Sequence, residues 1–384
     1  MRTTGIVPPV RELARIPALR RMAMRGVRQR PEVVLFESWN GRYADNPRAI
    51  SEELARRDLG LRLVWVAGAA TETPAGVERV APGSAAFLSA LGEAGTIVTS
   101  NALPGYFRKR RGCTYLQTWH GTPLKRIAFD IDNDRFRAEN RKYLENLGRD
   151  VGAWDALVSP NRFSTEIFRR AFRFDGPVLE TGYPRNDLLV SSEAEPVRRR
   201  VRGELGVASG QRCVLYAPTW RDRADFRLRL DLDRLAAELP DVVVLLRMHP
   251  LVDRPAGLGD AANVRDVSDH GDLRELMVAA DVLVSDYSSV MFDFAATRKP
   301  ILLYVYDLDE YRDELRGFYF DIEADAPGPL VRTFDELLEA LREPDAVRHD
   351  HAAAYGRFHD RFCHMDDGRA SARVVDSLPF RSRK

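Results

Sequence analysis

Histidine, arginine and small hydroxyl side chains directly follow several segments that have the composition of buried β-strands. These side chains are His120, Thr219, Arg247, His249, Ser288 and Ser289. In an open α/β sheet, ligands bind at the carboxyl ends of the strands. Guanidinium, imidazole and hydroxyl groups, together with the free N–H groups of a helix start, can bind a diphosphate without a metal ion. The pattern therefore predicts a crevice for a phosphate-bearing ligand.

The stretch Ser285-Asp286-Tyr287-Ser288-Ser289 lies between an apolar, β-branched segment, 280–284, and the helical apolar spacing of 290–297. A turn from a strand into a helix leaves unpaired backbone N–H groups, which attract an anion. Serine in this position is also a frequent N-cap of a helix that binds no ligand. The two roles are compatible, because Ser288 can cap the helix while its N–H group contacts an anion.

His120 stands before Gly121, where the apolar segment 114–118 ends. An unperturbed imidazole has a pKa near 6.5, so it can accept a proton near neutral pH. A structural histidine that hydrogen-bonds to the backbone is the alternative interpretation. A base opposite the predicted phosphate site favours an enzyme over a non-catalytic nucleotide-binding module.

Apolar strands alternate with amphipathic helices along the chain, which is typical of doubly wound α/β domains. Strands are expected at 32–37, 61–67, 95–100, 114–118, 155–159, 177–181, 212–216, 242–247, 264–266, 280–284 and 300–304. The 384 residues exceed what one core usually supports. We therefore expect two Rossmann-like domains, 31–190 and 205–345, that face each other across a cleft.

Two helix starts and one irregular region are also predicted in the first domain. Asp45-Asn46-Pro47 is expected to cap the helix after the first strand, and Asn161 or Ser164 the helix after 155–159. The charged region 129–150 contains no clear strand, so a helix and a loop beside the site are expected there.

Composition excludes several classes of protein. Acidic and basic residues balance to a net charge of +1, which does not fit a globally basic nucleic-acid binder. No apolar run approaches the ~20 residues that span a bilayer, and no signal peptide is visible. Cys113, Cys213 and Cys363 are far apart and odd in number, so they are expected to be buried thiols of a reducing compartment. Without a GxGxxG, P-loop or HExxH motif, we expect chemistry that needs no cofactor and no metal.

Residues 1–30 form a basic leader with eight arginines and the single acid Glu12. Apolar residues between the arginines, among them Leu19 and Met22, could form one face of a helix that Pro17 interrupts. A basic amphipathic segment can lie on an anionic membrane surface. A solvated leader, or a helix that covers the first sheet, is the alternative.

The strand-end stretches resemble the CDP-glycerol glycerophosphotransferases of wall teichoic acid synthesis. The similar stretches are Gln117 to Lys125, Thr181 to Asp187, Ala217 to Arg221, Arg247 to Pro250 and Ser285 to Asp293, with Glu37-Ser38-Trp39 and Asp45 to Arg48 near the family's start. The resemblance covers about residues 32–345. It implies a GT-B fold with an acceptor-side first domain and a nucleotide-side second domain. A helix from 346–384 would then return to the first domain.

The resemblance also implies roles for individual residues. His120 would be the catalytic base, and His249 the second catalytic histidine, which stabilises charge on the diphosphate. The pocket around the base would be shaped by Trp119, Gly121, Thr122 and Pro123. Contacts with CDP-glycerol are implied for Arg185, Pro218, Thr219, Arg247, Met248, Ser288, Ser289 and Asp293. Pro218 and Met248 would frame the cytidine, and Asp293, one turn into its helix, would accept from a hydroxyl or orient a neighbouring donor.

The activity implied is transfer of glycerol phosphate from CDP-glycerol to a hydroxyl of a lipid-linked teichoic acid or related glycopolymer, with release of CMP. The chain length resembles the short, primase-type members, since polymerising members often carry a further N-terminal region. CDP-ribitol is the close alternative donor. A GT-B glycosyltransferase or epimerase that uses a UDP-sugar is more distant, because those enzymes commonly hold the ribose with a carboxylate where this chain has Asp-Tyr-Ser-Ser. The expected location is the cytoplasm, peripherally on the inner face of the cell membrane.

Overall fold

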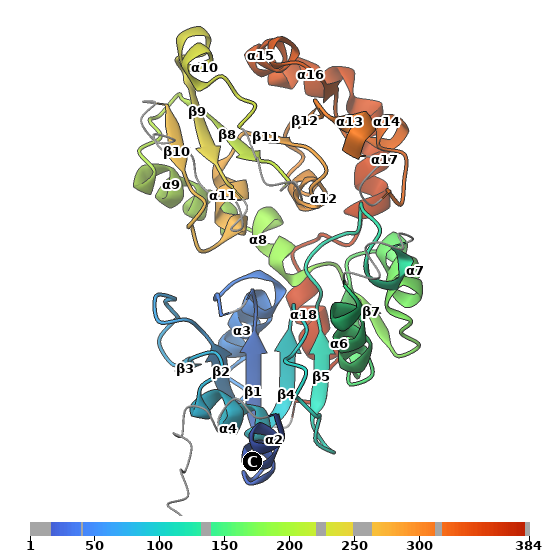
Figure 1. Cartoon of the computed structure of the whole chain (residues 1–384). Coiled ribbons are helices and arrows are strands. Elements are labelled where there is room, and N and C mark those ends of the chain that lie inside the picture. Colours follow the sequence, from blue (N-terminus) through green and yellow to red (C-terminus); the bar gives the residue numbers. More distant parts are fainter. Residues whose placement is uncertain are drawn as a thin grey trace, which may run out of the picture.

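The computed structural model describes residues 17–39, 41–131, 140–219, 228–248, 263–311 and 317–380. It contains two separate parallel sheets, one in the lower part of Figure 1 and one in the upper part. The part of the chain built around each sheet is called the first half and the second half below. Mixed α/β structure with two parallel sheets confirms the predicted fold class.

The first sheet has seven strands in the order β3-β2-β1-β4-β5-β6-β7, and all its strand pairs are parallel. The strands are β1 (Arg30–Glu37), β2 (Arg62–Val66), β3 (Glu78–Val80), β4 (Ala94–Thr99), β5 (Thr114–Gln117), β6 (Ala156–Ser159) and β7 (Val178–Glu180). In the centre, Leu35 of β1 pairs with Val64 on one side and Ile97 on the other. The four apolar residues 33–36 are fully buried, as expected for a parallel strand that helices cover on both faces.

Helices of the first half connect these strands. They are α2 (Pro17–Arg25), α3 (Asp45–Arg57), α4 (Ala85–Glu93), η1 (Ala128–Asp130), α6 (Arg141–Val151), α7 (Arg162–Phe172), η2 (Pro184–Asn186) and α8 (Asp187–Val190). Of the two caps considered for α7, Asn161 is the one used, since its side chain accepts from the N–H group of Ser164. The cap predicted for α3 is wrong. The N-cap position is Ala44, and Asp45 already belongs to the first turn.

The second sheet has six parallel strands in the order β10-β9-β8-β11-β12-β13. Its strands are β8 (Arg212–Ala217), β9 (Val242–Leu246), β10 (Val264–Asp266), β11 (Val282–Ser285), β12 (Ile301–Tyr304) and β13 (Leu330–Val331). The helices that follow the first half are α9 (Ala194–Glu204), α10 (Leu232–Glu238), α11 (Leu273–Ala279), α12 (Val290–Ala295), α13 (Leu308–Glu310), α14 (Ile322–Asp325), α15 (Phe334–Arg342), α16 (Pro344–Asp350), α17 (Ala352–Phe362) and α18 (Ala370–Asp376).

All eleven strands expected from the sequence occur in the two sheets. Two further strands, β3 and β13, were not predicted. They have three and two residues and lie at the edges of their sheets, so they carry too little apolar pattern to be recognised. The three cysteines are buried and unbridged, as expected.

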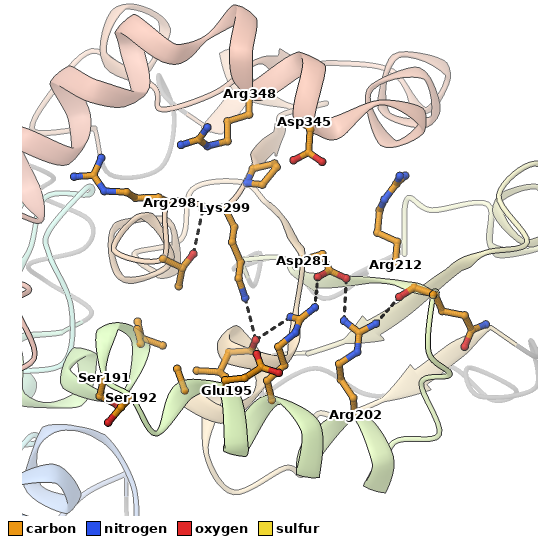
Figure 2. A pocket seen from close by; sticks show the side chains of 18 of the residues that line it. Ser191, Ser192, Glu195, Arg202, Arg212, Asp281, Arg298, Lys299, Asp345 and Arg348 are labelled. Carbon is orange, nitrogen blue, oxygen red and sulfur yellow. Dashed lines mark hydrogen bonds and ion pairs between the residues drawn. The ribbon is translucent and has the colours of Figure 1, made fainter.

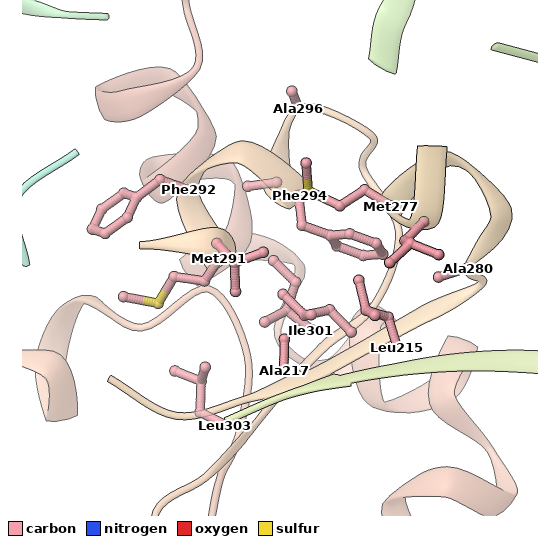
Figure 3. Close-up of a cluster of buried hydrophobic side chains, with 14 of the residues drawn as sticks. Leu215, Ala217, Met277, Ala280, Met291, Phe292, Phe294, Ala296, Ile301 and Leu303 are labelled. Carbon is pink, nitrogen blue, oxygen red and sulfur yellow. The ribbon is translucent and has the colours of Figure 1, made fainter. Parts of the chain in front are cut away.

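The core of the second half fixes the helix that follows β11. Met291 and Phe294 of α12 pack with Leu215 of β8 and Ile301 of β12, as Figure 3 shows. Phe294 is fully buried, so its truncation to alanine should cost about 3–5 kcal/mol of stability. This packing holds the turn before α12 in place at the carboxyl edge of the sheet.

The segment 346–384, expected to return to the first domain, divides between the two halves. Phe358 and Phe362 of α17 belong to the core of the second half. Val374 and Val375 of α18 belong instead to a core cluster of the first half. The return to the first sheet is therefore made by α18, after α17 has packed on the second half.

Candidate active site

The carboxyl ends of the first sheet's strands point toward the second half, as the arrowheads of β1, β4 and β5 show in Figure 1. The loop after β5 contains His120, and the loop after β1 lies next to it. Arg185 of η2 bonds both to the backbone of the His120 loop and to Asp293 of the second half. Predicted site residues from both halves therefore meet at this edge.

His120 has a defined tautomer. Its Nδ1 atom lies 2.9 Å from the carbonyl oxygen of Ser100, and because a carbonyl only accepts, Nδ1 carries the proton. The lone pair of the neutral ring is therefore on Nε2. Burial lowers the pKa of His120 below its usual value near 6.5, which keeps the ring neutral at physiological pH. This is the state that a general base needs.

Two tryptophans flank the imidazole of His120. Trp119 stacks on it with ring centroids 4.1 Å apart and an interplanar angle of 26°, and Trp39 approaches from the loop after β1 at 5.0 Å. Both tryptophans have positive φ angles, 52° for Trp119 and 45° for Trp39. Bulky residues rarely adopt this conformation, and such strain concentrates at functional sites.

Arg185 connects both halves through two carboxylates. Its guanidinium donates to Asp45 of α3 at 2.8 Å and to Asp293 of α12 at 2.6 Å. It also donates to the carbonyl oxygen of His120 at 2.9 Å. All three partners are protein groups, so Arg185 holds the His120 loop against α12. Asp293 accepts from the guanidinium of Arg185, and its expected roles toward a ligand stay predictions.

Gly121 allows the two halves to touch beside His120. A Cβ atom at this position would lie 2.6 Å from the hydroxyl oxygen of Ser289 and 3.0 Å from its Cβ atom. A side chain at this position would require the hydroxyl of Ser289 to rotate and its Cβ atom to shift by a few tenths of an ångström, so glycine permits the close approach. The neighbouring Thr122 and Pro123 are buried.

The turn before α12 is arranged differently from a simple cap. Ser289 occupies the N-cap position, yet its side chain makes no capping hydrogen bond. The hydroxyl of Ser288 accepts instead from the N–H group of Val290 at 3.3 Å. Both serines are half-buried, and Ser289 lies opposite Gly121, next to His120 in the sequence.

The other residues predicted to contact CDP-glycerol lie at the ends of β8 and β9. Thr219 donates its N–H group to Asp286 at 2.8 Å, which joins this loop to the turn before α12. Pro218 is buried, and the side chain of Met248 is only 2% exposed within the core, so it offers a ligand little surface. His249 lies outside the described residues.

Arg247 follows β9 and is held by backbone carbonyl groups. Arg247 donates to the carbonyl oxygens of Val267 and His270, at 2.9 and 2.6 Å. Burial, and then the charge of Arg42 from the loop after β1, lower the pKa of Arg247 to about 10. Three aspartates of the second half, Asp272, Asp269 and Asp266, act in the opposite direction, so charges of both signs act on Arg247.

A cavity of about 1000 Å³ lies elsewhere, at the amino ends of β8, β11 and β12 (Figure 2). Arg198 and Lys299 donate to the last carbonyls of α11, and Asp281 pairs with Arg198 and Arg202. These cations complete the end of a helix and neutralise a carboxylate. The cavity lies at the amino edge of the second sheet, whereas the predicted site residues follow the carboxyl ends of the strands. It does not belong to the site.

Three residues of the first half have roles that the sequence did not reveal. Asp45 binds both Arg185 and the indole of Trp39, and the buried Asn46 bonds to the carbonyl of Trp119 and the N–H group of Arg185. Asp-Asn-Pro before a helix has the composition of an ordinary cap, and this signal concealed the side-chain contacts. Trp39 was recognised only as part of a family motif.

A family model described as CDP-Glycerol:Poly(glycerophosphate) glycerophosphotransferase matches residues 19–379. The chain is 40% identical to the teichoic acid poly(glycerol phosphate) polymerase of Bacillus subtilis, over 90% of this chain and 48% of that protein. It thus spans about half the length of that relative. It is 38% identical to the protein of the same name from Bacillus spizizenii, over 90% of this chain and 92% of that one.

Solved structures give the same result. A histidine-to-asparagine variant of the wall teichoic acid polymerase TagF, soaked with CDPG, superposes with a TM-score of 0.87 and 38% identity over 94% of this chain and 91% of that one. The UDP-GlcNAc 2-epimerase of Neisseria meningitidis shares the fold alone, with a TM-score of 0.53 and 12% identity over 90% of this chain and 99% of that one. The chain belongs to the CDP-glycerol:poly(glycerophosphate) glycerophosphotransferase family.

Proposed function

We propose that the protein transfers glycerol phosphate from CDP-glycerol to a hydroxyl group of a teichoic acid acceptor and releases CMP. The observation that carries the proposal is the state of His120. Its Nδ1–H group is held by Ser100, its Nε2 lone pair is available, and its loop touches the turn before α12 through Gly121. A base from the first half thus lies beside the proposed donor site of the second half.

In the proposed reaction the acceptor oxygen forms a bond to the glycerol-bearing phosphorus of CDP-glycerol. The bond from that phosphorus to the bridging oxygen breaks, and CMP leaves with the electron pair. Nε2 of His120 takes the proton of the acceptor hydroxyl. Phosphoryl transfer gains mainly from positioning and electrostatic stabilisation, which this arrangement supplies without a covalent intermediate.

The donor would lie between the two halves with its diphosphate near the turn before α12. Ser288, Ser289 and Thr219 offer hydroxyl and N–H groups there, and Arg247 offers positive charge. Arg42, from the loop after β1, adds a second positive charge that acts on Arg247. His249 is retained in the proposal as the second catalytic histidine, on the resemblance alone.

The test is release of CMP. The protein is incubated with CDP-glycerol, CDP-ribitol or UDP-N-acetylglucosamine, each with a short glycerol-phosphate oligomer as acceptor. CMP formed from CDP-glycerol, with elongation of the acceptor by one unit, is the expected result. If CDP-ribitol is turned over faster than CDP-glycerol, CDP-ribitol is the donor instead. Release of UDP alone would contradict the proposal.

A lipid-linked acceptor would bring the protein to the inner face of the membrane, and α2 offers a surface for that contact. Met24 of α2 is buried in a core cluster of the first half. The helix therefore covers the first half, which is one of the two alternatives expected for the leader. Leu19 and Met22 are 36% and 66% exposed among the arginines of the same helix. No helix in the described part of the chain is long and apolar enough to cross a bilayer.

Flotation with vesicles tests this part of the proposal separately. The protein should co-float with vesicles that contain phosphatidylglycerol and remain behind with neutral phosphatidylcholine vesicles. A Leu19→Ser/Met22→Ser variant should co-float at least about threefold less, because it loses the apolar contact. Equal co-flotation of the variant and the unchanged protein would remove α2 from the proposal.

A further inference from the structure

Trp39 exposes much of its indole directly beside the proposed base. Its relative exposure is 42%, and among the described residues Tyr143 is the only other aromatic side chain classed as exposed. Burial is the usual environment of so large an apolar ring, so an exposed one that stands at a site is a candidate binding surface. Trp39 is also not part of the predicted donor site.

The indole of Trp39 is held firmly in this exposed position. Its Nε1–H group donates to Asp45 at 2.8 Å, and Asp45 is buried, with its other carboxylate oxygen on Arg185. The backbone of Trp39 is fixed in the left-handed region at φ 45°. Gly41, at φ 100°, accepts from the N–H group of Gly68 at 2.9 Å, which anchors the same loop on β2. A ring fixed in this way loses little freedom when it binds a ligand.

The position of the Trp39 ring indicates that it contacts the acceptor and not the CDP-glycerol donor. Trp39 comes from the first half, whereas the proposed donor contacts come from the second. Its centroid is 5.0 Å from that of His120, at an angle of 56°, while Trp119 already stacks closely on the imidazole. Trp119 is thus the better support for the base, and the exposed surface of Trp39 is left for a molecule that approaches His120 from the first half.

We propose that Trp39 is the platform for the acceptor and that the terminal glycerol unit of a glycerol-phosphate acceptor packs on its indole. The C–H groups of the polyol contact the ring, and the adjacent hydroxyl reaches Nε2 of His120, where its proton goes. This inference rests on the proposed function, since it assumes the bond between the acceptor oxygen and the glycerol-bearing phosphorus. Aromatic rings with a fixed polar end are well suited to such contacts.

The test compares Trp39→Ala and Trp39→Phe with the unchanged protein, and uses Tyr143→Ala as the matched control for loss of an exposed ring. Steady-state kinetics are measured with CDP-glycerol and a glycerol-phosphate oligomer, and CMP release is also measured without acceptor. Trp39→Ala should raise the KM for the oligomer about tenfold or more, and the KM for CDP-glycerol by far less. Trp39→Phe should recover most of the loss, and Tyr143→Ala should behave like the unchanged protein.

An equal loss of oligomer transfer and of acceptor-free CMP release in Trp39→Ala would overturn the inference, because the ring would then only orient His120. Circular dichroism and the melting temperature of each variant exclude unfolding as the cause. Failure of the proposed function gives a different result, namely no CMP release from CDP-glycerol even by the unchanged protein. CMP release by the unchanged protein with an unaltered acceptor KM in Trp39→Ala would refute the platform alone.

Discussion

At the scale of single residues, His120 owes its chemistry to its immediate neighbours. The carbonyl of Ser100 fixes the proton on Nδ1, Trp119 covers one ring face, and burial lowers the pKa. Each of these contacts comes from the loops after β4 and β5, so adjacent strands of one sheet assemble the proposed base. The nearby Arg185 binds the backbone of His120 and not its ring.

The lowered pKa of His120 predicts the acidic limit of activity. A base must be neutral, so activity should fall as pH decreases through the pKa of the folded enzyme. Because burial lowers that pKa below the usual value near 6.5, half-maximal kcat/KM should occur below pH 6.5. The measurement is kcat/KM for CDP-glycerol between pH 4.5 and 8. If kcat/KM is half-maximal well above pH 6.5, the prediction that burial lowers the pKa of the catalytic histidine is contradicted.

At the scale of elements, the contact between the His120 loop and the turn before α12 depends on the absence of a side chain at Gly121. The halves come so close that an added Cβ atom would overlap Ser289. The core around Phe294 makes α12 hard to displace, because Met291, Phe292 and Phe294 are all buried in it. A side chain added at position 121 would therefore have to displace Ser289, between the proposed base and the proposed donor site.

Gly121→Ala should reduce transfer at least about tenfold, since a displacement of a fraction of an ångström at the reacting groups is costly. Gly203→Ala is the matched control, because Gly203 lies in α9 with nothing within 4 Å of an added Cβ atom. Rates of CMP release and melting temperatures are compared for both variants. Normal transfer by Gly121→Ala would show that the contact is not needed for chemistry.

At the scale of the whole molecule, ion pairs join the two halves beside the cleft. Arg48 of α3 pairs with Asp272 at 2.9 Å, and Glu52 of the same helix pairs with Arg274 at 3.4 Å. Arg185 adds a buried connection through Asp293. These pairs hold the two halves close together.

Removing two of these cations should open the molecule. Arg48→Met/Arg274→Met leaves Asp272 and Glu52 without their partners across the cleft, so the radius of gyration from small-angle scattering should increase and kcat should fall. Arg234→Met is the control, because the partners of Arg234, Glu238 and Asp335, lie within the second half. An unchanged radius of gyration in the double variant would show that other contacts keep the halves together.

The sequence predicted those parts of the fold and site that depend on local pattern. Alternating strands and helices placed His120, Thr219 and Arg247 at strand ends, because the carboxyl edge follows directly from a parallel sheet. The partners of Arg185 could not be predicted in the same way. They lie on helices of different halves, and their contact depends on how the halves pack.

The same limit explains the two local errors. Asp45 was taken for a helix cap because of its residue type, but its carboxylate is used by Trp39 and Arg185. The strands β3 and β13 have three and two residues, and pairing with a neighbouring strand defines them more than their own residues do. Both errors arise where tertiary contacts decide the role of a short segment.

The most direct test of the central claim separates binding of the donor from chemistry in His120→Asn. Asparagine can still fill the space beside Trp119 but cannot act as the base. CMP formation from CDP-glycerol and a glycerol-phosphate oligomer should fall at least about 10²-fold, while calorimetry should give a dissociation constant for CDP-glycerol within about threefold of that of the unchanged protein. Near-normal CMP formation by His120→Asn would contradict the assignment of His120 as the base.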